Sequence, residues 1–455
     1  MAGGRHKRVT SGSLGCALAW VALMLAGVNA VAQPSTDEQV APERIVTVTE
    51  ADLLAPLSLE VLVPFAVENN PNIGAVRSEW EASKERIRAQ SWYENPTVTL
   101  IPDTGDMAET RAGPQGNSVE ISQAIPFPGK LGLRSKIAES RSEANYQLLE
   151  AAIQEITRQV RARYADYNLA KRSLEINNDT TDLTRQFAEV AQARYRVGKA
   201  AQQDVILAQE QLSRLAAERV VYLGDVETAI GALNALLDRA PRAPLGPPTD
   251  LDAKPLKISL ARLVDIADAN RPELLSQTHV VDASHQSERL ARLGYLPDFK
   301  LGVQWIDVRG GTNPAFARDG NDIWMVKLGF SVPLWANRIG AEVRDTQAQV
   351  RREEFHQRDL RNQVFDQVQR QYERVVVAAR TEEIYRGTLI PQTTERIAAA
   401  QSGYQAGVVD FLTVIDSLRS LEQVRLQRDR AVRDYQQALA DLERAIGQPL
   451  SNSRP

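Results

Sequence analysis

The chain has few of the residues that build disulfide-linked or membrane-embedded helical proteins. Only 6% of its 455 residues are aromatic, and Cys16 is the only cysteine. Cys16 lies near the start of an apolar run, whereas a lipidated cysteine would follow such a run. We therefore expect a mature chain with no lipid anchor, disulfide or thiol chemistry. No later stretch approaches about 18 apolar residues, which excludes a transmembrane helix.

The chain also lacks a strong charge bias and the usual catalytic motifs. Its formal net charge is −4, which gives no reason to expect a nucleic-acid partner. There is no phosphate loop, nucleophile elbow or zinc motif, so we predict no enzyme activity and no cofactor. His279, Asp282 and His285 would span too wide an arc of one helix for a tight metal site, so we predict no bound metal.

The N-terminal segment has the pattern of a secretory signal peptide. Basic residues from Arg5 to Arg8 precede an apolar run from Leu14 to Gly27. We expect cleavage after Ala32, with Ala30 as the alternative, and hence an exported protein. The next residues, 33–56, are predicted to form a loose N-terminal arm.

The remaining sequence contains one internal duplication. Three landmarks recur in the same order: 57–71 with 258–272, 95–100 with 296–301, and 192–198 with 401–407. We therefore predict two structural repeats, 57–237 and 257–447. A proline-dense linker, 238–256, separates them, because such proline density is incompatible with helix or sheet. A frayed tail, 448–455, follows.

Each repeat begins with a helix and two segments of alternating apolar and polar residues. The predicted strands cover about 96–102, 117–125, 297–308 and 322–333. A strand of about ten residues can cross a membrane when it is tilted, with one face in lipid. The alternation gives a polar face that carries Lys300, Gln304, Lys327 and Ser331. Trp305, Trp324 and Trp335 suit the lipid face and its interfacial belt.

Two long helices are predicted after the strands in each repeat. Apolar residues recur every three or four positions, for example at Val364, Val368 and Tyr372, and form a narrow coiled-coil seam. Helices of about 60 residues would reach roughly 90 Å. Gly198 and Gly407 are the predicted hinges of the two helical hairpins.

Four strands cannot close a barrel, so the chain is expected to oligomerise. An open edge in lipid leaves backbone groups unpaired. Two copies would give a barrel filled by side chains, whereas three copies give twelve strands and a lumen. The predicted fold is thus mainly α with a small β-barrel part. It is a 12-stranded trimeric barrel that continues into a long α-helical coiled-coil tunnel in the periplasm.

The sequence resembles the TolC-like outer-membrane efflux family over nearly the whole mature chain. The duplicated Asn-Pro and Arg-Pro helix starts, the Pro-Phe-Pro-Gly-Lys turn at 126–130 and the paired Tyr-x-x-Gly motifs carry the resemblance. The turn is similar to that of the heavy-metal branch, the CzcC-like and CusC-like proteins. The resemblance implies a homotrimer in the outer membrane that works with a periplasmic adaptor and an inner-membrane RND-type pump.

The resemblance also implies where a periplasmic gate would lie. Asp204, Tyr404 and Asp416 match entrance residues of the family by position. Val409 stands where some members carry a linking arginine, and Thr413 where they carry another aspartate. Asp410 is close enough to replace that missing charge. Asp204 and Asp410 could equally be N-caps of the helices that follow, and the two roles are not exclusive.

Two other functions remain open from the sequence. A channel for type I protein secretion or drug efflux would share the architecture. A periplasmic coiled-coil adaptor or scaffold without a pore is the rival from another class, although it would not need lipid-facing strands.

Overall fold

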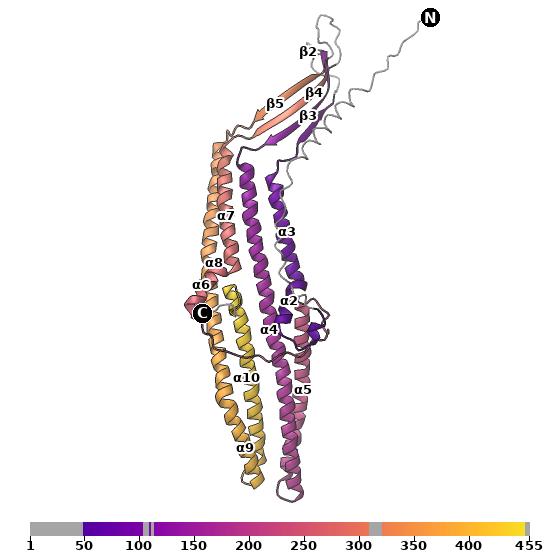
Figure 1. Ribbon diagram of the computed structural model, residues 1–455, viewed down its shortest axis with the longest axis vertical. Helices are drawn as coiled ribbons and strands as arrows, with labels where there is room; N and C mark the ends of the chain where they lie inside the picture. Colours follow the sequence, from indigo (N-terminus) through magenta and orange to yellow (C-terminus); the bar gives the residue numbers. More distant parts are fainter. Residues whose placement is uncertain (1–48, 103–108, 111–112, 309–320, 451–455) are drawn as a thin grey trace, which may run out of the picture. The chain divides into compact units, whose positions relative to one another are not determined.

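The computed structural model describes residues 49–102, 109–110, 113–308 and 321–450. The predicted signal peptide and residues 451–455 of the predicted tail lie outside these ranges. The described chain is mainly α-helical with one small antiparallel sheet, as predicted (Figure 1). Among its helices, none is both long enough and apolar enough to span a membrane.

The order of two helices, two main strands and a long helical hairpin occurs twice along the chain. The elements before the linker are η1 (Asp52–Leu54), α2 (Leu59–Asn69), α3 (Pro71–Ser91), β1 (Thr97–Ile101), β2 (Glu109–Thr110), β3 (Gly113–Ile125), α4 (Lys130–Arg196) and α5 (Gln202–Leu236). Those after it are α6 (Leu260–Asn270), α7 (Pro272–Arg292), η2 (Leu293–Tyr295), β4 (Phe299–Val308), β5 (Ile323–Phe330), α8 (Ala336–Ile384), η3 (Tyr385–Leu389), α9 (Ile390–Ala406) and α10 (Phe411–Ile446).

The sheet joins the two halves through one antiparallel strand pair. Its order is β1-β3-β4-β5, with the short β2 also pairing with β3. Strand β5 ends at Phe330, short of the predicted end near residue 333. The chain turns there, since Leu334 N donates to the Val332 carbonyl at 2.8 Å and Pro333 has no N–H for a ladder bond.

The first helix of each hairpin is long, but the second is shorter than predicted. α4 has 67 residues, whereas α5 has 35 and α10 has 36. α8 runs through η3, a π-helical turn, into α9, where Pro391 lacks the N–H of a regular helix. The prediction of hairpin helices of about 60 residues was therefore wrong for α5 and α10.

The two short helices end where another helix begins. Asn70 Nδ2 donates to the Leu236 carbonyl at the end of α5 (2.9 Å), and Asn70 Oδ1 accepts from Asn72 N at the start of α3 (3.0 Å). In the second half, Arg271 directly precedes the first residue of α7. Its Nη1 donates to the Arg444 carbonyl near the end of α10 (2.6 Å). The repeated Asn-Pro and Arg-Pro motifs are thus helix junctions.

Residues 49–56 and the linker pack on α4 and are not loose. Leu53 and Leu57 are fully buried in the core of the first half. Tyr164 donates its hydroxyl to the Leu57 carbonyl (2.6 Å), and Tyr167 donates to the Gly246 carbonyl (3.0 Å). The prediction of a loose arm up to residue 56 fails for this stretch, because Leu53 is buried in an apolar core.

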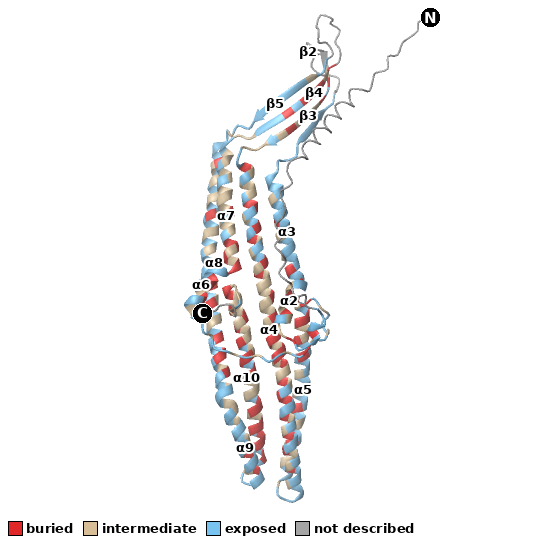
Figure 2. Ribbon diagram, in the orientation of Figure 1, coloured by how far each residue is buried: buried red, intermediate tan, exposed pale blue. Residues whose placement is uncertain are grey.

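Burial is concentrated along the helices. Figure 2 shows buried residues along α4, α5 and α10, while β5 is mostly exposed. Each half has its own core, and a third cluster joins the two helical hairpins near their bends.

Candidate functional site: the hairpin bends and the sheet

Each helical hairpin turns at a glycine in the left-handed region. Gly198 has φ = 71° and Gly407 has φ = 79°, a conformation that side-chain-bearing residues adopt only at a cost. Gly407 ends α9 as its C-cap. The predicted hinges are therefore the points where the chain reverses.

The two bends share one apolar core. It consists of Phe187, Ala191, Ala208, Ala400, Tyr404, Phe411, Val414, Ile415 and Leu418, drawn from both hairpins. The ring of Tyr404 packs against that of Phe411 at 5.1 Å between centroids. Figure 1 shows both bends at the same end of the helices. This core holds the polar groups around it in fixed positions.

Tyr404 links the second hairpin to the first. Its hydroxyl donates to Asp204 Oδ2 at 3.0 Å, and its side chain is only 4% exposed. Burial and then the Asp204 carboxylate raise the pKa of Tyr404 to about 12. The phenol therefore stays protonated and remains a hydrogen-bond donor throughout the physiological pH range.

Arg194 makes a second link between the bends. Its guanidinium lies 4.9 Å from the centre of the Tyr404 ring, and its Nη1 donates to the Gln405 carbonyl. Nη2 also donates to the Lys199 carbonyl at 3.3 Å, within its own bend. Sequence reasoning missed Arg194, although it lies in the duplicated motif opposite Gly403.

The three predicted gate carboxylates have different settings in the structure. Asp204 lies in the first turn of α5 without capping it, so its predicted alternative role as an N-cap was wrong. Asp410 is the N-cap of α10 and accepts from Thr413 N (3.0 Å) and Oγ1 (2.6 Å). These bonds hold the pKa of Asp410 below its usual value. Asp416 is exposed, 3.8 Å from Arg419.

The sheet has one apolar face that no part of the described chain covers. Its members pair in register, as in Trp305 with Trp324, and Val303 with Val326. On β5, Val326, Leu328 and Phe330 are 73%, 83% and 69% exposed. Apolar patches of this kind are typical of membrane or protein contact surfaces.

The predicted interfacial tryptophans differ in setting. Trp305 is half-buried and donates from Nε1 to Asp322 Oδ2 at 3.1 Å. Trp324 is 64% exposed on β5, and Trp335 is 77% exposed at the start of α8. Each can present its ring to lipid while the polar N–H stays near water.

The opposite face of the sheet is polar and internally bonded. Lys327 pairs with Glu120 at 2.7 Å, and Gln304 donates to Ser118 Oγ at 3.1 Å. Lys300 lies on this face in register with Gly329. Beyond β5, Ser331 Oγ accepts from Asp298 N at 2.9 Å. The predicted polar face is thus present.

The histidine motif does not gather metal ligands. His285 lies 3.8 Å from Glu354, at the surface. Within the described ranges, no group of three His, Cys, Asp or Glu side chains could hold a metal ion.

A sheet with one apolar and one polar face, joined to helical hairpins that close against each other, defines a channel-type outer-membrane protein. The family model for outer membrane efflux proteins matches residues 62–239 and 263–448. The chain belongs to the outer membrane efflux protein family.

Two curated proteins resemble the chain along most of its length. The cobalt-zinc-cadmium resistance protein CzcC of Cupriavidus metallidurans is 22% identical over 92% of this chain and 95% of its own. The alkaline protease secretion protein AprF of Pseudomonas aeruginosa is 23% identical over 83% of this chain and 82% of its own.

Solved structures show the same fold. CusC matches with a TM-score of 0.72 at 16% identity, covering 92% of this chain and 99% of that one. VceC of Vibrio cholerae matches with a TM-score of 0.68 at 17% identity, covering 86% and 96%. The expected resemblance to TolC-like channels is confirmed.

Proposed function

We propose that three copies of the chain close one barrel and form the exit duct of a tripartite efflux system. The observation that carries this proposal is the sheet, whose apolar face is exposed and whose edge strands, β1 and β5, have no further partner among the described residues. An open edge in lipid would cost several kcal/mol per unpaired group. Three copies, each contributing β1, β3, β4 and β5, remove every edge and leave a lumen.

The polar face would line that lumen, and the helices would continue it into the periplasm. On this inner face, the charges of Glu120 and Lys327 are paired with each other, so neither side chain is a buried unpaired charge. In this arrangement the two repeats form a pseudo-sixfold tube. A periplasmic adaptor and an inner-membrane RND-type pump would supply the driving force, since the duct itself is passive.

Metal cations are the cargo that we propose first. CzcC is named for cobalt, zinc and cadmium resistance, and it matches the chain over nearly its full length. The described residues hold no three-ligand metal site, so selection would belong to the pump. Protein secretion is the second candidate, because AprF matches almost as well. Zinc tolerance and protease secretion in a deletion strain would separate the two.

We propose that the bends form the gate and that the Tyr404–Asp204 and Arg194 links hold it closed. Val409 stands where some members of the family carry a linking arginine, and Arg194 would supply the missing guanidinium from the other hairpin. Threefold symmetry would repeat these links around the entrance, beside rings of Asp410 and Asp416 that favour cations.

Leu328→Arg tests the membrane placement of the sheet. Arginine at a lipid-facing strand position costs about 2–4 kcal/mol near the bilayer midplane, so we expect loss of heat-resistant trimers and of conductance. Val221→Arg is the control, because Val221 is 61% exposed on α5, away from the sheet. A soluble, non-conducting wild-type monomer would instead support the scaffold alternative.

Tyr404→Phe tests the gate. It removes the hydroxyl bonded to Asp204 but keeps the ring that packs on Phe411. We expect a larger single-channel conductance and more frequent opening in planar bilayers. Tyr195→Phe is the control, since Tyr195 occupies the equivalent repeat position and is 45% exposed. Equal behaviour of both variants would exclude the Tyr404 hydroxyl as a gate element.

A further inference from the structure

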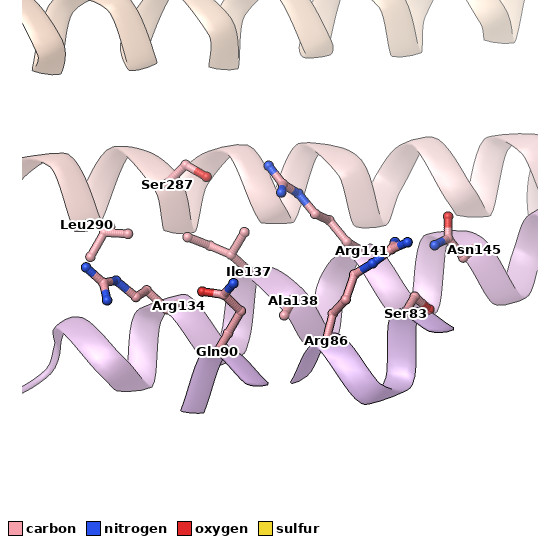
Figure 3. A pocket seen from close by; sticks show the side chains of 10 residues that line it. All are labelled: Ser83, Arg86, Gln90, Arg134, Ile137, Ala138, Arg141, Asn145, Ser287 and Leu290. Atoms are coloured by element: carbon pink, nitrogen blue, oxygen red, sulfur yellow. The ribbon is translucent and has the colours of Figure 1, made fainter. Parts of the chain in front are cut away.

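A basic cavity lies between α3, α4 and α7, away from the bends. It has a volume of about 440 Å³. Figure 3 shows that Arg86 projects from α3, and Arg134 and Arg141 from α4. No carboxylate lines the cavity. Three cations in one hollow repel each other unless an anion joins them.

The neighbouring acids balance these arginines only weakly. Arg86 pairs with Glu79 at 2.8 Å, but both side chains are more than half exposed. Arg134 lies 3.8 Å from Glu94, which is 71% exposed. Such solvent-exposed pairs contribute little. Within the described chain, the side chain of Arg141 makes no hydrogen bond or ion pair, and its backbone lies within α4.

The other lining groups suit an oxyanion on an apolar base. Gln90, Asn145 and Ser287 contribute amide and hydroxyl donors, while Ile137 and Leu290 are apolar. Guanidinium groups bind phosphate oxygens through two parallel hydrogen bonds, a geometry that a lysine ammonium does not offer. The cavity is also large enough for more than one oxyanion group.

The position of the cavity suggests the source of the anion. α4 begins at Lys130, directly after the turn from β3, and Arg134 follows one helical turn later. Arg141 lies seven residues further, or about 10 Å along the helix. If the sheet lies in the membrane, as the proposed function requires, the cavity lies at the depth of the phosphate headgroups.

We propose that Arg86, Arg134 and Arg141 form a binding site for a phosphate group. Two sources share this chemistry, namely the headgroup of an anionic phospholipid and free phosphate. Occupation of the site would tie α3 to α4 next to the barrel and neutralise three like charges there.

The test uses the full-length trimer, purified in neutral detergent and phosphate-free buffer. One arm measures inorganic phosphate binding by calorimetry. The other measures phosphatidylglycerol retained by native mass spectrometry, against phosphatidylcholine. We expect at least a roughly tenfold loss in Arg86→Gln/Arg141→Gln, the loss expected when charge-assisted bonds are removed.

A matched pair of substitutions controls for net charge. Arg77→Gln/Arg88→Gln removes two arginines from the same helix, α3, outside the cavity lining. It should bind as the wild type does. Arg141→Lys keeps the charge but loses the pair of parallel N–H donors, so this variant should bind the phosphate group with intermediate affinity.

The outcomes divide cleanly. Retention of phosphatidylglycerol alone identifies a lipid headgroup as the ligand, and binding of phosphate alone identifies a free anion. Absence of both in a folded wild-type trimer overturns the proposal, as does an equal loss in the control pair. If Arg86→Gln/Arg141→Gln fails to fold by circular dichroism, the Arg141→Lys comparison decides.

Discussion

We predict that Glu422 on α10 makes the stability of the hairpins dependent on pH. Its side chain is only 8% exposed, and within the described residues its Oε1 has no hydrogen-bond partner. Burial, followed by the charge of Glu218 on α5, raises its pKa from 4.5 to about 7, against the opposing charges of Arg214 and Arg419. The folded chain therefore favours the protonated acid.

The magnitude follows from the two pKa values. Between pH 4.5 and about 7 the folded state binds a proton that the unfolded state has released, so stability falls as pH rises. Above pH 7 the loss is complete. At about 1.4 kcal/mol per pKa unit, it amounts to roughly 3 kcal/mol.

Glu422→Gln removes the charge and keeps the shape. We expect the variant to unfold at a higher temperature than the wild type at pH 8, and at nearly the same temperature at pH 4.5. The assay is thermal unfolding of the detergent-solubilised protein, followed by helical circular dichroism. In Glu218→Gln, the loss of stability with rising pH should end at a lower pH than in the wild type, because Glu218 raises the pKa of Glu422.

Glu210→Gln is the control for a charge change on α5. Glu210 is exposed, so its substitution should leave the pH dependence as it is in the wild type. Parallel pH profiles for wild type and Glu422→Gln would refute the reasoning, since they would show that Glu422 is already neutral or well solvated in both states.

Two further predictions concern capping and the helix junction. Asp410→Ala should cost about 1 kcal/mol by removing the N-cap, whereas Asp410→Asn keeps the cap and removes only charge. Reduced cation selectivity of Asp410→Asn in planar bilayers, at unchanged thermal stability, would show a role at the entrance. Asn70→Ala should cost about 2 kcal/mol, because it removes hydrogen bonds to two helix ends. The exposed neighbour Asn69→Ala should cost less in the same melts; equal costs would contradict the junction role.

The strand faces could be predicted because their pattern is local. Alternation with period two assigns each residue to a face before any partner strand is known. The observed register, such as Leu301 with Leu328, places the predicted apolar residues on one face. Pairing of β3 with β4 across the two repeats required the structure, because no local pattern specifies which strands meet.

Helix lengths could not be predicted because long-range contacts set them. α5 ends at Leu236, whose carbonyl accepts a hydrogen bond from the side chain of Asn70, 166 residues earlier in the chain. The apolar periodicity of the sequence does not record that contact. The Asn-Pro motif could be recognised as part of the repeat. Its role as a helix junction depends on α5, which is far away in sequence.

The polar links at the bends show why duplication reveals hinges more readily than contacts. Gly198 and Gly407 are identical in the two repeats, because each performs the same backbone turn. A link between the repeats needs complementary side chains instead. Arg194 stands opposite Gly403 in the motif alignment, where a Cβ would lie 2.6 Å from the Cγ2 of Val409. Arg194 contacts the other repeat from a divergent position of the motif, whereas Tyr404 does so from a position that is tyrosine in both repeats. The motif alignment alone therefore does not separate residues that link the repeats from residues that do not.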